Sequence, residues 1–306
     1  PGQSRENGMS KITLLDGGMG QEIVKRSGDK ATPLWSTQSM IDHPGIVEAV
    51  HRDYFAAGAT IATTNTYAIH RDRLTKFGME DQFETLMAAA LAEAKAARNA
   101  YPQGRIAGSI GPLMASYRPD LMPEFDPARA SFAEVAGMLA GHVDLIICET
   151  VASVAHARAA LAGCADCGRP VWLAVTVSDD DGSKLRSGEG VGELLAVIQE
   201  FRPDAILVNC SVPEAMQAAL EILRGFGLPF GAYANGFTRI TEGFLKDSPT
   251  VDALEARKDL GPATYADFAL HWVGMGATII GGCCETGPAH IAEIARRLDR
   301  AGFEIV

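Results

Sequence analysis

Short runs of apolar and β-branched residues alternate with longer stretches of helical spacing along the whole chain. Most of the apolar runs are not interrupted by polar residues at every second position, which is typical of parallel strands buried on both faces. Eight strands are predicted, over 11–18, 59–67, 105–112, 143–150, 170–177, 204–211, 229–236 and 277–284. Helices are predicted over 43–58, 80–101, 131–142, 153–164, 191–201, 213–227, 264–276 and 287–302.

This alternation predicts an α/β protein built as a single (β/α)8 TIM barrel. An open, doubly wound sheet is the alternative, but no GxGxxG or GxxxxGK[ST] motif follows any predicted strand. No linker rich in proline, serine or charge divides the chain. We therefore expect one barrel domain over residues 9–306, preceded by residues 1–8 as a disordered tail or a segment left from cloning.

Composition narrows the function classes. The formal net charge of −11 disfavours a nucleic acid or a membrane surface as the main partner. No apolar run approaches the roughly 18–20 residues of a membrane span, and the polar start "PGQSRENGMS" lacks the apolar segment of a secretory signal. Six cysteines are too few for a disulfide scaffold in a chain of this size. We expect a cytoplasmic protein with small-molecule substrates, and the sequence does not indicate an oligomeric state.

Polar residues gather where the predicted strands end. In a barrel of this type the active site lies at the carboxyl ends of the strands. Loops begin there, so some polarity is expected at any strand end, but three cysteines are not. The residues at these ends are Asp16, Asn65, Thr66, Ser109, Glu149, Cys210, Asn235, Cys283 and Cys284.

The three cysteines predict a metal site. Cys210 ends the sixth predicted strand, and Cys283 and Cys284 end the eighth. One strand separates these two around a barrel, so their ends can converge. Gly281 and Gly282 would let the backbone leave strand geometry, so that both following sulfurs turn inward. Three thiolates with one open position are typical of a catalytic Zn²⁺ site. Three buried, unconnected cysteines are the alternative.

The charge of such a site suggests its chemistry. Three thiolates on Zn²⁺ leave a net charge of −1, which is unfavourable for generating hydroxide and suits binding of a substrate thiol instead. We therefore predict alkylation of a thiol. A zinc hydrolase on the same barrel would need histidine ligands, but the histidines fall mostly in predicted helices. A non-enzymatic protein with a closed, structural zinc is a further alternative.

The remaining cysteines are expected to play no part in this site. "CADC", from Cys164 to Cys167, follows a predicted helix and precedes the fifth strand, at the opposite end of the barrel. We interpret it as a surface turn with two incidental thiols, rather than a redox or metal motif. Cys148 lies in the apolar stretch "LIIC" and is expected to pack in the core.

Eight stretches of the chain carry a family resemblance: "LLDGGMG", "PLWS", "HRDYFAAGA", "TNTY", "GSIGP", "CET", "VNCS" and "GGCC". The pairing of "GGCC" with an upstream "NC" at a strand end is the most specific part. With these stretches, the chain resembles the homocysteine S-methyltransferase family from about residue 12 onward. The resemblance implies a zinc-dependent (β/α)8 barrel that methylates homocysteine to methionine.

The resemblance implies a role for particular residues. The zinc ligands of the family match Cys210, Cys283 and Cys284, and the acidic residues that bind the ammonium group of homocysteine match Asp16 and Glu149. Asp16 could otherwise be a turn former ahead of two glycines. Glu149 could otherwise be a favourable charge at the start of a helix.

The resemblance extends the candidate substrate-binding set to Gly17, Gly18 and Asn209, which lie beside these residues. A sulfonium or quaternary ammonium donor would be attracted by aromatic faces. Trp35 in "PLWS" and Tyr117 in "ASYRPD" are candidates, with core packing as the alternative for each. "PLWS" is similar to the S-methylmethionine-dependent branch, so S-methylmethionine is the first expected donor and betaine the second.

Overall fold

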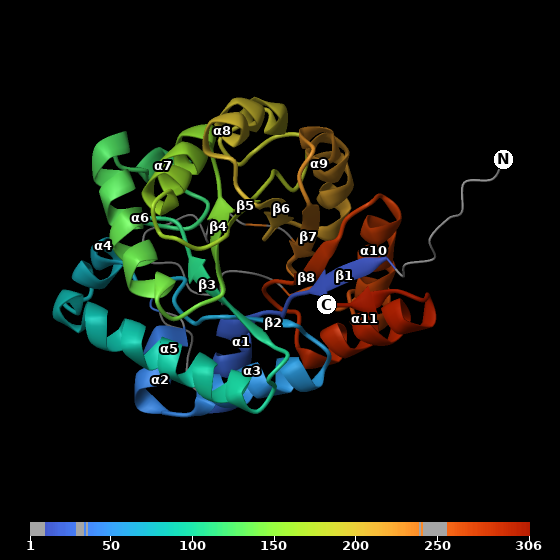
Figure 1. The fold of residues 1–306 in the computed structure, drawn as a ribbon, viewed down its shortest axis with the longest axis horizontal. Coiled ribbons are helices and arrows are strands. Elements are labelled where there is room, and N and C mark those ends of the chain that lie inside the picture. The colour runs from blue at the N-terminus through green and yellow to red at the C-terminus, as the bar shows by residue number, and fades with distance from the viewer. Residues whose placement is uncertain (1–9, 29–33, 35, 239, 241–255) are drawn as a thin grey trace.

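A computed structural model describes residues 10–28, 34, 36–238, 240 and 256–306 of the chain. Over these residues the strands lie at the centre and the helices pack around their outside (Figure 1). The proposed tail, residues 1–8, lies outside the described residues.

The elements follow one another in the predicted alternation. The strands are β1 (Lys11–Leu14), β2 (Ile61–Thr63), β3 (Arg105–Ile110), β4 (Leu145–Val151), β5 (Val171–Val175), β6 (Ala205–Asn209), β7 (Phe230–Ala234), β8 (Ile279–Gly282) and β9 (Glu304–Ile305). The α-helices are α1 (Met19–Ser27), α2 (Ser36–Asp42), α3 (Ile46–Ala56), α4 (Arg71–Thr75), α5 (Phe83–Asn99), α6 (Phe125–Ala140), α7 (Val154–Cys164), α8 (Leu194–Phe201), α9 (Met216–Leu223), α10 (Pro262–Gly274) and α11 (Pro288–Arg300). Short 3-10 helices are η1 (Glu80–Gln82), η2 (Pro119–Leu121), η3 (Val191–Glu193), η4 (Pro213–Ala215) and η5 (Arg224–Phe226).

All strands belong to one parallel sheet in the order β2-β3-β4-β5-β6-β7-β8-β1-β9. β1 pairs with β8 from the other end of the chain, with Thr13 opposite Ile279. The sheet curls until β2 reaches β1, where Leu15 and Ile61 form a parallel bridge. The α/β class and the parallel strands were predicted. The short strand β9, which pairs with β1, was not.

The sheet separates two layers of apolar side chains. Successive strand residues point to opposite faces, so Ile147 joins the cluster enclosed by the sheet while Cys148 joins the layer under the helices. The enclosed cluster is Leu15, Ile61, Ala107, Leu145, Ile147, Trp172, Ala174, Ala205, Leu207, Tyr233 and Ile279. The same alternation places Ser109 and Glu149, two residues beyond Ala107 and Ile147, on the enclosed face at the carboxyl ends of their strands.

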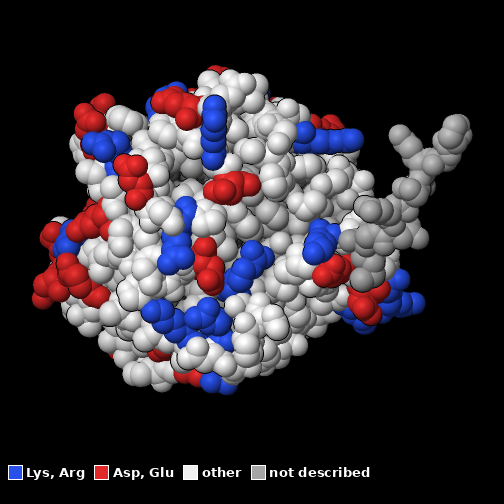
Figure 2. Space-filling view, in the orientation of Figure 1, with Lys and Arg blue, Asp and Glu red and all other residues white. Residues whose placement is uncertain are grey.

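The surface carries charges of both signs. Acidic and basic side chains are interspersed over the face seen in Figure 2. Ion pairs such as Arg71–Glu134, at 2.8 Å, and Arg296–Glu293, at 2.7 Å, are solvent-accessible and contribute little to stability individually. None of the described helices has the length and apolar character needed to cross a bilayer.

Candidate metal and substrate site

A pocket opens at the carboxyl ends of the strands, where the barrel prediction expects an active site. It has an empty volume of about 890 Å³, part of it open to solvent. Its walls come from almost every strand end. They include Asp16, Gly17, Gly18, Gln21, Thr63, Ser109, Tyr117, Glu149, Cys210, Tyr233, Cys283 and Cys284.

Three cysteine sulfurs meet in this pocket. Cys210 directly follows β6, and Cys283 and Cys284 directly follow β8. Their Sγ atoms all lie within 4.8 Å of one another. The sulfurs of Cys210 and Cys283 are in disulfide contact, and those of Cys283 and Cys284 are 4.0 Å apart. The structure thus brings together the three cysteines named from sequence, whereas the contact between Cys210 and Cys283 was not predicted.

The donor set of this cluster fits a zinc ion. Tetrahedral zinc binds thiolate sulfur at about 2.3 Å, which separates two ligand sulfurs by about 3.8 Å. The Cys283–Cys284 spacing of 4.0 Å matches this value, while Cys210 and Cys283 must separate to bind one ion. Among the described residues, no fourth His, Cys, Asp or Glu joins the group. Burial raises the pKa of the Cys284 thiol to about 11, so a bound cation is needed to hold it as thiolate at neutral pH.

The two glycines before the cysteine pair act differently from the prediction. Gly281 and Gly282 lie inside β8, and neither adopts a left-handed conformation. A Cβ on Gly281 would lie 2.6 Å from the Leu15 Cβ, and one on Gly282 would collide with the Thr286 side chain. The chain does leave strand geometry directly after Gly282, where Cys283 and Cys284 follow in a turn, but it does so without a left-handed glycine. These glycines are needed because neighbouring segments approach the strand closely, and it is Cys210 that is left-handed, with φ of 47°.

Gly17 and Gly18 also serve close packing. A Cβ on Gly18 would lie 2.7 Å from the Cys283 carbonyl oxygen, and one on Gly17 would collide with the Thr286 carbonyl. The Gly18 N–H donates to the Thr286 carbonyl at 2.8 Å, so this amide is already used within the protein. Both glycines line the pocket. Their absent side chains let the turn after β1 rest directly on the cysteine turn.

Asp16 links β1 to β2 at the pocket. Its side chain accepts hydrogen bonds from the Thr63 backbone N–H at 2.6 Å and from the Thr63 hydroxyl at 2.7 Å. Burial raises the pKa of Asp16 to about 7, although both hydrogen bonds oppose this shift. A nearby cation would lower the pKa again.

Glu149 lies on the same pocket. It accepts hydrogen bonds from the Ser109 hydroxyl at 2.5 Å and the Tyr233 hydroxyl at 2.8 Å. Burial raises its pKa against these two bonds. The alternative interpretation of Glu149 as a charge at a helix start is wrong, because the residue lies within β4 and α7 begins only at Val154. Among the described residues, neither Glu149 nor Asp16 is paired with a Lys or Arg side chain.

The other predicted contact residues are arranged unequally. Asn209 is buried behind the pocket wall, where its side chain accepts from the Thr150 N–H at 3.1 Å and donates to the Cys210 sulfur at 3.4 Å. Tyr117 does line the pocket, and the Arg186 guanidinium lies 5.3 Å from the centre of its ring. Trp35 lies outside the described residues.

Several pocket residues were not predicted from the sequence, and two of them lie beside the cysteines or the carboxylates. Gln21, on α1, has a buried side-chain nitrogen with no hydrogen-bond partner among the described residues. The Gln21 side chain is near enough to Cys284 to lower the pKa of that thiol against the effect of burial. No helix was predicted over this segment, so nothing marked Gln21. Tyr233 lies in a predicted strand, and its position two residues before Asn235 at the strand end was the available signal.

The "CADC" segment is only partly as predicted. Cys167 is half-buried in a turn, but Cys164 is the last residue of α7 and is 1% exposed. Its sulfur lies 3.7 Å from that of Cys148 in the layer under the helices. The interpretation of Cys164 as a surface thiol is wrong, because the helix turns it toward the sheet. The predicted core position of Cys148 is confirmed.

Comparison with known proteins identifies the family of this chain. Residues 13–298 match the family described as Homocysteine S-methyltransferase. Homocysteine S-methyltransferase of Escherichia coli K12 is 30% identical over 304 residues, covering 94% of this chain and 95% of that protein. Methionine synthase of Mycobacterium tuberculosis is also 30% identical over 304 residues, but these are 24% of its length. The metallated crystal structure of E. coli homocysteine methyltransferase MmuM has a TM-score of 0.78, with 28% identity, covering 94% of this chain and 96% of that one.

These matches identify the protein as an S-methyltransferase with a parallel α/β fold. The chain belongs to the homocysteine S-methyltransferase family and is an enzyme of that family. The family predicted from the sequence stretches is therefore confirmed.

Proposed function

We propose that the protein catalyses the zinc-dependent transfer of a methyl group to the thiol of homocysteine, giving methionine, with S-methylmethionine as the donor. One observation carries this proposal. Three thiols within 4.8 Å of one another open into the pocket that holds two buried carboxylates without a cationic partner among the described residues. We interpret the curled parallel sheet, whose strands β1 and β2 are joined at the Leu15–Ile61 bridge, as a (β/α)8 barrel.

Cys210, Cys283 and Cys284 would hold the Zn²⁺. Bound zinc would supply a fourth position for the acceptor thiol and lower the pKa of that thiol. The task of the chain is to present three sulfurs at one point. The ends of β6 and β8, on either side of β7, do this, with the left-handed backbone at Cys210 and the close packing of Gly18 on the cysteine turn. The metallated crystal structure of E. coli MmuM supports a metal in this family.

Asp16 and Glu149 would bind the ammonium group of homocysteine. Each carboxylate is fixed by neutral donors, Thr63 for Asp16 and both Ser109 and Tyr233 for Glu149. A cation placed between two buried carboxylates favours their charged forms. Homocysteine binding should therefore lower the pKa of both groups and release protons near pH 7, since the pKa of Asp16 is about 7 without ligand.

The methyl transfer is a displacement at carbon. The acceptor sulfur forms a bond to one methyl of the sulfonium donor, and the bond from that methyl to the donor sulfur breaks. Its electron pair stays with the departing sulfur, so the cationic donor leaves as neutral methionine. Alignment of the two sulfurs on one line is the main contribution expected from the protein.

S-methylmethionine is preferred to betaine as the donor because the "PLWS" stretch, which includes Trp35, is similar to the S-methylmethionine-dependent branch of the family. Tyr117 contributes an aromatic wall to the pocket. The Arg186 guanidinium lies 5.3 Å from the centre of the Tyr117 ring, so this ring already makes a cation–π contact within the protein. We therefore assign Tyr117 to shaping the donor space.

Neither alternative function is favoured by the geometry. A hydrolytic zinc would need histidine ligands, and none of the described histidines lines the pocket. A closed structural zinc would need a fourth protein ligand, and the described residues offer three.

The proposal is tested with the reduced, zinc-loaded protein. Homocysteine is supplied with S-methylmethionine and, separately, with betaine, and the methionine formed is measured. We expect product from S-methylmethionine. Product from betaine alone would reassign the donor, and product from neither would contradict the proposed reaction. X-ray absorption at the zinc edge should show a fourth sulfur when homocysteine is added. An unchanged coordination shell would contradict thiol binding at the metal.

A further inference from the structure

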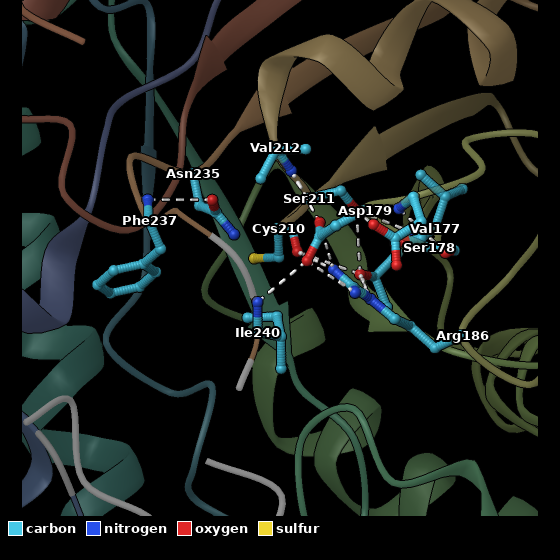
Figure 3. A network of polar contacts seen from close by, with 12 residues as sticks. Val177, Ser178, Asp179, Arg186, Cys210, Ser211, Val212, Asn235, Phe237 and Ile240 are labelled. Carbon is cyan, nitrogen blue, oxygen red and sulfur yellow. Dashed lines mark hydrogen bonds and ion pairs between the residues drawn. The ribbon is translucent and has the colours of Figure 1, made fainter. Parts of the chain in front are cut away.

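The loop between β5 and η3 supplied none of the predicted site residues, yet it contacts Cys210 at the end of the neighbouring strand (Figure 3). Asp179 and Arg186 both belong to this loop, and their side chains form an ion pair that is only 10% and 12% exposed. A pair this buried is expensive to desolvate, so its hydrogen bonds must be well satisfied.

The pair is fully engaged. The two terminal nitrogens of Arg186 donate to the two carboxylate oxygens of Asp179 at 3.0 and 2.9 Å. The remaining guanidinium nitrogen donates to the Thr176 hydroxyl at 3.2 Å. One terminal nitrogen also donates to the carbonyl oxygen of Cys210 at 3.3 Å. The Thr176 hydroxyl donates to that same carbonyl at 3.2 Å, so two donors from the β5 side fix one peptide group.

That peptide group belongs to the residue with the least favourable backbone in the cysteine cluster. The left-handed region is unfavourable for a non-glycine residue because its Cβ comes too close to the following carbonyl oxygen, and Cys210 has φ of 47°. Such a conformation persists only where its surroundings hold it. Arg186 and Thr176 hold the carbonyl side of Cys210, and its position sets the direction of the thiol.

Asp179 extends the same network along the rim. One carboxylate oxygen accepts the Val212 N–H at 3.1 Å, just beyond Cys210, and the other accepts the Ile240 N–H at 3.0 Å. Figure 3 shows these bonds converging on one carboxylate from the segments after β6 and β7. Arg186 also lies 5.3 Å from the Tyr117 ring centre. The ion pair therefore connects the backbone of a thiol ligand to a wall of the substrate pocket.

We propose that Arg186, oriented by Asp179, is a positioning residue for the metal centre: it fixes the backbone of Cys210 so that this thiol points at Cys283 and Cys284. This inference rests on the proposed zinc site. The guanidinium also places a positive charge beside a centre whose three thiolates would leave a net charge of −1 on Zn²⁺. Arg186 itself does not touch the proposed ammonium site, so its effect should fall on zinc retention and on kcat more than on the KM for homocysteine.

The test compares zinc release from reduced, zinc-loaded proteins to a chromogenic chelator, followed by kcat and KM. Arg186→Gln should release zinc at least tenfold faster than wild type, with Arg186→Lys in between because it keeps the charge but loses the forked geometry. Arg257→Gln is the matched control. The Arg257 side chain is 14% exposed and pairs with Glu214 and Asp259, and it should behave as wild type.

Thr176→Val provides a second, uncharged variant. It removes the other donor to the Cys210 carbonyl without leaving an unpaired charge, and it should also accelerate zinc release. If both Thr176→Val and a folded Arg186→Gln release zinc at the wild-type rate, the inference is overturned while the zinc site stands. Where Arg186→Gln does not fold, Thr176→Val alone decides. A wild-type protein that binds no zinc through its cysteines would instead overturn the proposed function, and the inference with it.

Discussion

Two groups of three cysteines occur in this protein, and the spacing of a single pair of sulfurs does not by itself distinguish them. The rim cysteines are Cys210, Cys283 and Cys284, and the helix-side cysteines are Cys148, Cys164 and Cys167. The closest helix-side sulfurs are 3.7 Å apart, against 4.0 Å between Cys283 and Cys284. Only the rim group has three sulfurs in mutual reach and opens into a pocket with buried carboxylates.

The difference follows from which face of the sheet each thiol occupies. Cys148 points outward from β4 and meets the end of α7, where apolar side chains surround it. Glu149, the next residue, points to the opposite face and into the pocket. A shift of one residue along a strand therefore separates a packing thiol from a site carboxylate. Chemistry at this fold depends on the convergence of several strand ends rather than on the presence of a reactive residue type.

The largest test of this comparison removes one rim thiol. Cys284→Ala should lower bound zinc well below one ion per chain and reduce methionine formation by about 10³-fold or more, because the acceptor thiol then lacks its metal. Zinc content by atomic absorption and product formation are the measurements. Cys167→Ser is the matched control and should retain both. Equal zinc loss in the two variants would contradict the distinction between the groups.

A smaller effect is expected from neutralising a carboxylate. Glu149→Gln keeps the shape, and its amide can accept from one of the Ser109 and Tyr233 hydroxyls and donate to the other, but it removes one charge from the proposed ammonium site. A hydrogen bond to a charged group is worth about 1.5–3 kcal/mol, so homocysteine should bind roughly 10–100-fold more weakly while zinc content stays unchanged. Titration calorimetry measures the affinity. Unaltered affinity would remove Glu149 from the substrate site.

The pH dependence of binding isolates Asp16. Its pKa is about 7 in the ligand-free protein, so the carboxylate becomes charged as pH rises from 6 to 8. Binding of L-methionine, whose thioether carries no proton, should therefore tighten over this range, and the dependence should flatten in Asp16→Asn. Calorimetry at several pH values checks this. A slope that persists in Asp16→Asn would assign the proton to another group.

The raised pKa of Asp16 affects stability in the opposite direction: substrate binding should tighten as pH rises, but the free energy of unfolding should fall. The folded protein holds the Asp16 proton more tightly than the unfolded chain, whose pKa is near 3.8. The stabilisation from this proton is therefore complete below about pH 4 and is lost as pH rises through about 7. Bound substrate should offset the loss, because it pairs with the charged form.

The smallest effect belongs to the helix-side group. Cys164→Ala removes a buried sulfur between α7 and β4 and should lower the free energy of unfolding by about 1–2 kcal/mol. Methionine formation at a temperature where the variant is folded should equal that of wild type. Urea denaturation and the activity assay are the two measurements. Loss of zinc in Cys164→Ala would contradict the separation of the two cysteine groups, because it would show that zinc binding depends on both.

The sequence allowed the strands and the thiols to be found, because both leave local signals. Each of the eight predicted strand ranges overlaps one of β1–β8, since parallel strands buried on both faces read as continuous apolar runs. The convergence of Cys210 with Cys283 and Cys284 followed from their places at strand ends. The segment around α1 carried no such pattern, so Gln21 was missed.

What could not be predicted depends on close contacts between distant segments. Gly281 and Gly282 suggested a flexible backbone, but the structure gives them extended conformations and tight neighbours. Asn209 is adjacent to Cys210 and was expected at the substrate, yet its amide binds Thr150 behind the pocket. The Asp179–Arg186 pair lies in a polar loop that looks like ordinary surface until its burial is known.

Contacts between early and late segments of the chain also bear on how the protein folds during synthesis. Tyr54 donates to the carbonyl of Thr286 across 232 residues of sequence, and β1 pairs with β8 from the other end of the sheet. On the ribosome, β1 can meet β2 early, at the Leu15–Ile61 bridge, but its edge toward β8 stays unpaired until residues 279–282 have emerged. The three thiols of the proposed metal site can come together only after Cys283 and Cys284 have been made, so capture of a metal would be a late event in synthesis.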